Sequence, residues 1–195
     1  MRLALIYAAC ILGAALFASC APAKQAARSA PEVNESMAWN DRSATLNSAG
    51  SYRQAAEAAD TALRFDPKNA LAWNNKSVAL IGIGNHAGAL QAADRSTELK
   101  PDNALAWSNK GVALRLLGRT DDALQATERA LQLDPKNALI WYNHACYAAI
   151  LGRRDTALKS LARSLALEPR LKGDAAREPD LDSLKIDPDF KKLVE

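Results

Sequence analysis

The stretch that decides the fold runs from Asn103 to Pro135 and reads N-A-L-A-W-S-N-K-G-V-A-L-R-L-L-G-R-T-D-D-A-L-Q-A-T-E-R-A-L-Q-L-D-P. It recurs along the chain every 34 residues, four times in all and without insertions. Tryptophan, glycine, alanine and proline markers keep their register in every copy: Trp39, Trp73, Trp107, Trp141; Gly50, Gly84, Gly118, Gly152; Ala55, Ala89, Ala123, Ala157; Pro67, Pro101, Pro135, Pro169. A repeat this regular indicates an architecture and leaves the partner open.

Each copy has the pattern of two helices joined by a glycine turn. In the third copy, apolar residues predict a first helix over residues 104–117, which ends at Gly118 because glycine readily takes a positive φ there. Residues 120–122 (T-D-D) predict the start of the second helix, with capping side chains and negative charge at the positive end of the dipole. The second helix ends before Pro135, and Asn137 is predicted to cap the next helix.

A helix pair of this size cannot bury its apolar face alone, so neighbouring pairs must stack. The period, the helix pair and the markers resemble the tetratricopeptide repeat (TPR) family, whose W, G, A and P positions are taken by Trp107, Gly111, Ala123 and Pro135. This resemblance implies an all-α fold, an α-solenoid of four TPR helix-turn-helix repeats with a C-terminal capping segment.

The copies depart from the family pattern at two positions. The family's first-helix leucine is replaced by Arg42, Lys76, Lys110 and His144. Its second-helix phenylalanine is replaced by Ala59, Ala93, Thr127 and Leu161. The smaller residues at the second position predict close packing of the two helices in a pair.

The register of the markers predicts the domain boundaries. Repeats one to four occupy residues 36–69, 70–103, 104–137 and 138–171, and the register is lost after Pro169. Residues 172–195 are predicted to cap the last apolar surface, with short helices near residues 170–177 and 188–194. The alternative is that the sequence F-K-K-L-V from Phe190 is a motif for a partner.

The N-terminus has the pattern of a secretion signal. A positive start is followed by an apolar run over residues 3–17, which is shorter than the roughly 20 residues of a membrane span. The sequence Ala18-Ser19-Cys20 resembles the lipobox of bacterial lipoproteins. That resemblance implies a lipoprotein signal peptide over residues 1–19, lipidation of Cys20, and an outer-membrane anchor facing the periplasm. An ordinary signal cut after Ala23, giving a soluble periplasmic or secreted protein, and an uncleaved anchor remain alternatives.

The segment after Cys20 is predicted to be a tether. Residues 21–32 (A-P-A-K-Q-A-A-R-S-A-P-E) contain two prolines and no large apolar side chain, so they have nothing to bury. We therefore assign residues 20–35 to the lipidated cysteine and a flexible linker.

The sequence indicates no catalytic, cofactor or metal site. Metalloprotease, nucleophile-elbow, phosphate-loop and dinucleotide motifs are absent from the sequence, and no cofactor is expected. His144 and Cys146 are two residues apart and would diverge on a helix, so we expect both to be packing residues. The net charge is +3 with both signs interleaved, which does not favour a nucleic-acid partner.

One column of equivalent positions suggests a binding hypothesis. In TPR proteins the position two residues past the tryptophan faces the concave groove, and its amides could grip the backbone of an extended peptide. Apolar columns lie beside it, and the predicted groove is Asp41, Leu71, Asn75, Val78, Leu105, Asn109, Val112, Leu139 and Asn143. The alternative is that these amides only hydrogen-bond a neighbouring helix.

The resemblance implies a membrane-anchored, non-enzymatic adaptor that binds a protein partner or extended peptide in envelope assembly or regulation, and we expect a monomer. The alternative is a homo-oligomeric structural module of the cell envelope. The carboxylate clamp of TPR co-chaperones is not predicted. Its lysine and arginine positions hold Asn40, Leu105 and Asn109 or, one repeat later, Asn74, Leu139 and Asn143.

Overall fold

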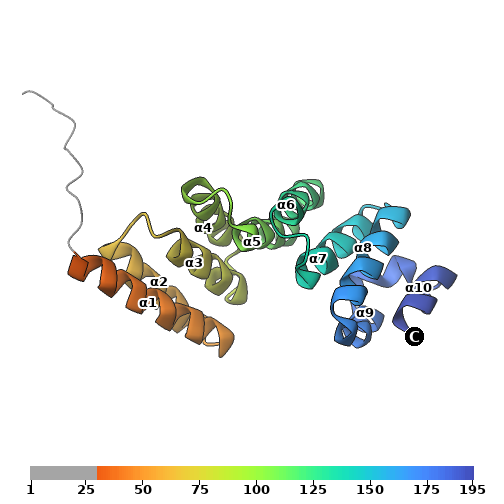
Figure 1. Cartoon of the computed structure of the whole chain (residues 1–195), viewed down its shortest axis with the longest axis horizontal. Helices are drawn as coiled ribbons and strands as arrows, with labels where there is room; N and C mark the ends of the chain where they lie inside the picture. Colours follow the sequence, from red (N-terminus) through yellow and green to blue (C-terminus); the bar gives the residue numbers. More distant parts are fainter. Residues whose placement is uncertain (1–29) are drawn as a thin grey trace, which may run out of the picture.

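The computed structural model describes residues 30–195, and every regular element in that part of the chain is a helix. The predicted signal peptide, Cys20 and the linker up to residue 29 lie outside the described residues. Four helix pairs follow one another: α1 (Ala30–Ser48) and α2 (Tyr52–Phe65), α3 (Ala70–Gly82) and α4 (His86–Leu99), α5 (Ala104–Leu116) and α6 (Thr120–Leu133), α7 (Ala138–Ile150) and α8 (Arg154–Leu167). Consecutive helices pack against each other from one end of the array to the other (Figure 1). The predicted all-α solenoid of four repeats is confirmed.

The first helix starts earlier than the predicted linker allows. α1 begins at Ala30, so residues 30–35 are helical rather than part of a tether. Proline is tolerated here because the first backbone N–H groups of a helix have no intrahelical acceptor, and Pro31 is the second residue of α1. Glu32 adds negative charge to the first turn, where it favours the helix dipole.

A glycine with positive φ ends the turn after each first helix. Gly118 has a φ of 78°, and its three counterparts lie between 69° and 80°. A β-carbon disfavours this conformation, which explains the glycine marker. α6 then begins at Thr120, but its N-cap residue is Arg119 and no side chain caps it, so the predicted side-chain cap is wrong. The predicted cap at Asn137 is confirmed, because its side chain accepts from two backbone N–H groups at the start of α7.

The tryptophan and proline markers form one contact between repeats. In three repeats the indole Nε1 donates to the carbonyl oxygen of the proline that follows the preceding second helix, at 2.9 Å. The pairs are Trp73 with Pro67, Trp107 with Pro101 and Trp141 with Pro135. This bond satisfies a turn carbonyl and holds each repeat against the one before it.

The two helices of each pair approach closely through small residues, as predicted. In the second pair the Ser77 hydroxyl donates to the carbonyl oxygen of Ala89 at 2.9 Å, and Ala93 is fully buried. The third pair replaces this serine with Gly111 and this second alanine with Thr127. A β-carbon on Gly111 would lie 3.1 Å from Cγ2 of Thr127, so the larger residue fills the space that the smaller one leaves.

The C-terminal segment caps the stack with four short helices, η1 (Pro169–Leu171), α9 (Lys172–Arg177), η2 (Pro179–Leu184) and α10 (Pro188–Val194). The predicted helices near 170–177 and 188–194 are confirmed, and η2 was not predicted. Proline begins η2 because a first helical residue needs no N–H acceptor. Leu181, Leu184 and Phe190 join the core of the fourth repeat at 0, 4 and 2% exposure. The buried ring of Phe190 rules out the alternative of a freely presented partner motif.

The Gly111 and Thr127 pair predicts strong coupling between two substitutions. Gly111→Ser should destabilise the protein by about 1–3 kcal/mol through overpacking against Thr127. Thr127→Ala alone should cost about 1 kcal/mol, because it leaves a small void. The double variant recreates the Ser77 and Ala93 arrangement and lets the new hydroxyl reach the carbonyl of Ala123, so it should recover most of the loss. Urea unfolding measures all four free energies, and additive losses would contradict this packing.

Candidate partner-binding face

One face of the first helices carries a row of exposed apolar side chains. Met37, Leu71, Leu105 and Leu139 are 56, 49, 55 and 60% exposed. Residues four and seven positions further along lie on the same side of each helix. The first helices contact one another directly, α1 with α3, α3 with α5 and α5 with α7. We call the resulting surface the first-helix face: Met37, Leu71, Leu105, Leu139, Asp41, Asn75, Asn109, Asn143, Ala44, Val78 and Val112.

All nine residues of the predicted groove lie on this face, but two of their amides already have partners. Nδ2 of Asn75 donates to Oδ1 of Asn40 at 2.8 Å, and Nδ2 of Asn109 donates to Oδ1 of Asn74 at 2.8 Å. Each bond joins a first helix to the first helix of the preceding repeat. The alternative interpretation, hydrogen bonding to a neighbouring helix, therefore applies to these two residues.

The amide of Asn143 differs from the other two. The position that would hold its partner is Ser108 instead of asparagine. Within residues 30–195, the Asn143 side chain makes no hydrogen bond to the protein. Its Nδ2 donors and Oδ1 acceptor therefore lie on the first-helix face without an intramolecular partner.

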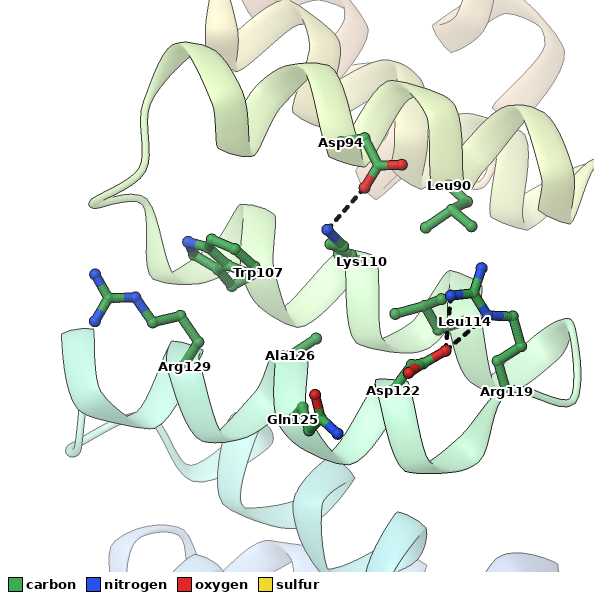
Figure 2. Close-up of a pocket in the computed structure, with 10 residues that line it drawn as sticks. All are labelled: Leu90, Asp94, Trp107, Lys110, Leu114, Arg119, Asp122, Gln125, Ala126 and Arg129. Carbon is green, nitrogen blue, oxygen red and sulfur yellow. Dashed lines mark hydrogen bonds and ion pairs between the residues drawn. The ribbon is translucent and has the colours of Figure 1, made fainter.

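The other side of α3 and α5 is a polar junction with the preceding repeat. Figure 2 shows Lys110 of α5 reaching Asp94 of the preceding α4, with 2.9 Å between Nζ and Oδ1. The same ammonium lies 5.1 Å from the ring centroid of Trp107. These groups line a pocket of about 370 Å³ between α4, α5 and α6. Its counterpart one repeat earlier pairs Lys76 with Asp60 at 2.6 Å.

These junctions explain why a cation can replace the leucine that the family pattern places there. The methylene stem of the lysine covers apolar surface, the ammonium lies over an aromatic face, and an acid of the preceding repeat pairs with it. Partly exposed ion pairs contribute under about 1 kcal/mol each. The pocket in Figure 2 also contains an ion pair between Arg119 and Asp122, so most of its charged groups are paired with one another.

Family models and solved structures agree on the repeat architecture. Two tetratricopeptide repeat models match, one over residues 104–137 and one over residues 46–104. The fold resembles crystal structures of TPR proteins. The chain is a tetratricopeptide-repeat protein. No curated protein sequence matches it.

Three solved structures illustrate the likeness. The crystal structure of MamA protein aligns with a TM-score of 0.63 at 20% identity, covering 82% of this TPR protein and 90% of MamA. A thermophilic TPR protein of Thermus thermophilus aligns with a TM-score of 0.65 at 21% identity, covering 76% and 81%. The first TPR of Spaghetti, bound to an HSP90 peptide, aligns with a TM-score of 0.58 at 20% identity, covering 62% and 95%. At these identities the likeness establishes the fold.

The fourth repeat of this TPR protein has a buried histidine where the second and third repeats have lysine. His144 is 6% exposed, its Nδ1 lies 2.8 Å from Oγ of Ser160, and burial lowers its pKa. The hydrogen bond ties α7 to α8. Ser160 is itself only 2% exposed, and burial raises the pKa of the Cys146 thiol. These environments favour packing roles for the three side chains, as the sequence predicts for His144 and Cys146.

One charged residue beside the face was missed by the sequence analysis. Arg115 of α5 forms a two-pronged ion pair with Asp180 of η2, with Nε 2.9 Å from Oδ2. The two residues are 65 positions apart, and no short motif connects them. Arg115 and Asp180 are 31 and 18% exposed, so the pair is partly shielded from water. Among the residues that define the first-helix face, Asp41 is the charged one, and the Arg115–Asp180 pair lies beside the face.

Proposed function

We propose that this TPR protein is a membrane-anchored adaptor whose first-helix face is the concave surface that binds a segment of a protein partner. The observation that carries the proposal is the row of Met37, Leu71, Leu105 and Leu139. These side chains are about half exposed, and they recur in register in all four repeats. Aligned apolar exposure of this kind marks interaction surfaces, whereas single exposed leucines do not.

The apolar area of this row determines how much of the face a partner segment must cover. Completing the burial of a half-exposed Leu or Met side chain contributes about 1 kcal/mol. Four such side chains supply about 4 kcal/mol, which is no more than the cost of immobilising a partner on the surface. A useful partner segment must therefore cover the whole row and also contact flanking residues such as Val78 and Val112.

The chemistry of this face argues against an acidic ligand like that of a carboxylate clamp. The Spaghetti structure is bound to an HSP90 peptide. Here the first-helix face lacks a lysine, and Arg115 at its margin is paired with Asp180 within the chain. An uncharged apolar partner surface therefore fits better than a free carboxylate.

We also propose that the protein is anchored through a lipid on Cys20 and works at the outer membrane, in envelope assembly or regulation. The support is the lipobox-like sequence after the apolar run, which lies outside the described residues. No helix within residues 30–195 is both long and apolar enough to cross a bilayer. We propose a monomer because the C-terminal segment covers the last repeat, as the ends of a solenoid require.

The proposed surface is tested by replacing Leu71 and Leu105 with alanine in one variant. Binding of partners should fall at least tenfold, because two central contacts are lost. Stability should change by less than about 1.5 kcal/mol, since both side chains are half exposed already. Quantitative crosslinking and mass spectrometry in the producing cell measure the partners, and thermal unfolding measures stability.

Ile186→Ala is the matched control, because Ile186 is 85% exposed but belongs to the C-terminal segment and not to a first helix. It should leave the set of partners unchanged. A folded Leu71 and Leu105 double variant that retains every partner would place the binding surface elsewhere.

The anchor is tested separately with Cys20→Ala. In cells fed a radiolabelled fatty acid, the wild-type protein should incorporate label and fractionate with membranes. The variant should incorporate none, because the acylated thiol is gone. Label that persists in the variant, or is absent from the wild type, would rule out lipidation at Cys20 and leave the adaptor proposal standing.

A further inference from the structure

Part of the face in the fourth repeat is already occupied by the chain itself. Cys146 and Ala149 of α7 are 4 and 3% exposed, whereas the equivalent Val112 and Arg115 of α5 remain partly exposed. The difference comes from η2, which packs against α7 and places the Ser183 hydroxyl 3.5 Å from the carbonyl oxygen of Ala149. The structure therefore contains one example of a segment lying against this side of the first helices.

That internal segment is helical and amphipathic. Leu181 and Leu184, three positions apart in η2, are 0 and 4% exposed and belong to the same apolar cluster as Cys146. Asp180 precedes them and reaches past α7 to pair with Arg115 of α5. A helical segment thus forms most of its backbone hydrogen bonds internally, and it contacts the first helices mainly through apolar side chains.

The open part of the face is poorly equipped to hold an extended segment. An extended backbone brings unpaired N–H and C=O groups, which must find partners once they are buried. Asn75 and Asn109 would be the natural partners, but the Nδ2 group of each already donates to an asparagine of the preceding repeat, which leaves mainly their Oδ1 acceptors for a ligand. Of the three amides, only that of Asn143 is wholly unengaged. A helix has no comparable need, because its backbone groups pair internally.

The spacing of the exposed row also suits a helix. Neighbouring packed helices lie about 8–10 Å apart, so this is the expected interval between Leu71 and Leu105 and between the other members of the row. Seven residues of an α-helix advance about 10.5 Å, so apolar side chains at heptad spacing would meet successive members. Three intervals require a helix of roughly 20 residues.

We infer that the partner segment is an amphipathic α-helix of about 20 residues, with an uncharged apolar stripe at i, i+3 or i+4, and i+7, that lies along the row from Met37 to Leu139 beside η2. This inference rests on the proposed function, because it names the class of partner for the same face. Negative charge on the contact stripe is disfavoured beside Asp41, the one charge on the face that no ion pair engages within the described chain, and elsewhere on the face no free charge is available to pair with a charged partner residue.

The test uses a displayed library of random 21-residue peptides, selected on the full chain. The selected peptides should place apolar residues with a period of 3.6 and contain few prolines. As synthetic peptides they should gain helical circular dichroism on binding. They should bind the Leu71 and Leu105 double alanine variant at least tenfold more weakly and the Ile186→Ala control unchanged. A proline in the middle of such a peptide should weaken binding at least tenfold.

The outcomes separate this inference from the function on which it rests. Peptides that depend on Leu71 and Leu105 but alternate apolar and polar residues, or bind without gaining helicity, would overturn the helical partner and keep the binding face. Selection that yields no peptide sensitive to Leu71 and Leu105 would overturn both the face and the helical partner.

Discussion

In the second, third and fourth repeats, the tryptophan indole donates to the carbonyl oxygen of the proline that follows the preceding second helix. This contact shows the constraint on which the structure depends. A single helix pair cannot bury its apolar face, so each repeat is stable only against its neighbours. In this chain the neighbours are joined at two levels. Trp107 bonds to Pro101, and Lys110, which lies over the same indole, pairs with Asp94. Both contacts belong to the side of the first helices that faces the preceding second helix.

This arrangement separates the stacking side of each first helix from the side left for partners. Lys76 and Lys110, which replace the family's leucine, are used within the stack, as are the Nδ2 groups of Asn75 and Asn109. What remains exposed on the first-helix face is mainly the apolar row. The C-terminal segment then covers part of α7 with a helix of its own, so the solenoid both closes its end and displays the type of contact that its open face favours.

The period of 34 residues was enough to predict the helix pairs, the glycine turns and the columns that share a face, because all of these follow from local spacing. The hydrogen bond between the side-chain amides of Asn109 and Asn74 could have been suspected from their spacing of 35 residues, since nearly equivalent positions of adjacent first helices are neighbours. The pairing of Arg115 with Asp180 could not, because it depends on the path of an irregular tail. Local sequence also placed the start of α1 too late, since proline near a helix start is compatible with both a tether and a first turn.

The most direct measurement of the central claim is site-specific photocrosslinking in the producing cell, with a photoreactive phenylalanine analogue at single positions. A probe at Leu105 reports on the first-helix face, and a probe at Gln125 reports on the pocket side shown in Figure 2. We predict a discrete partner adduct from position 105 and none from position 125. An adduct from position 125 with none from position 105 would contradict it, and would move the binding surface to the junctions between repeats.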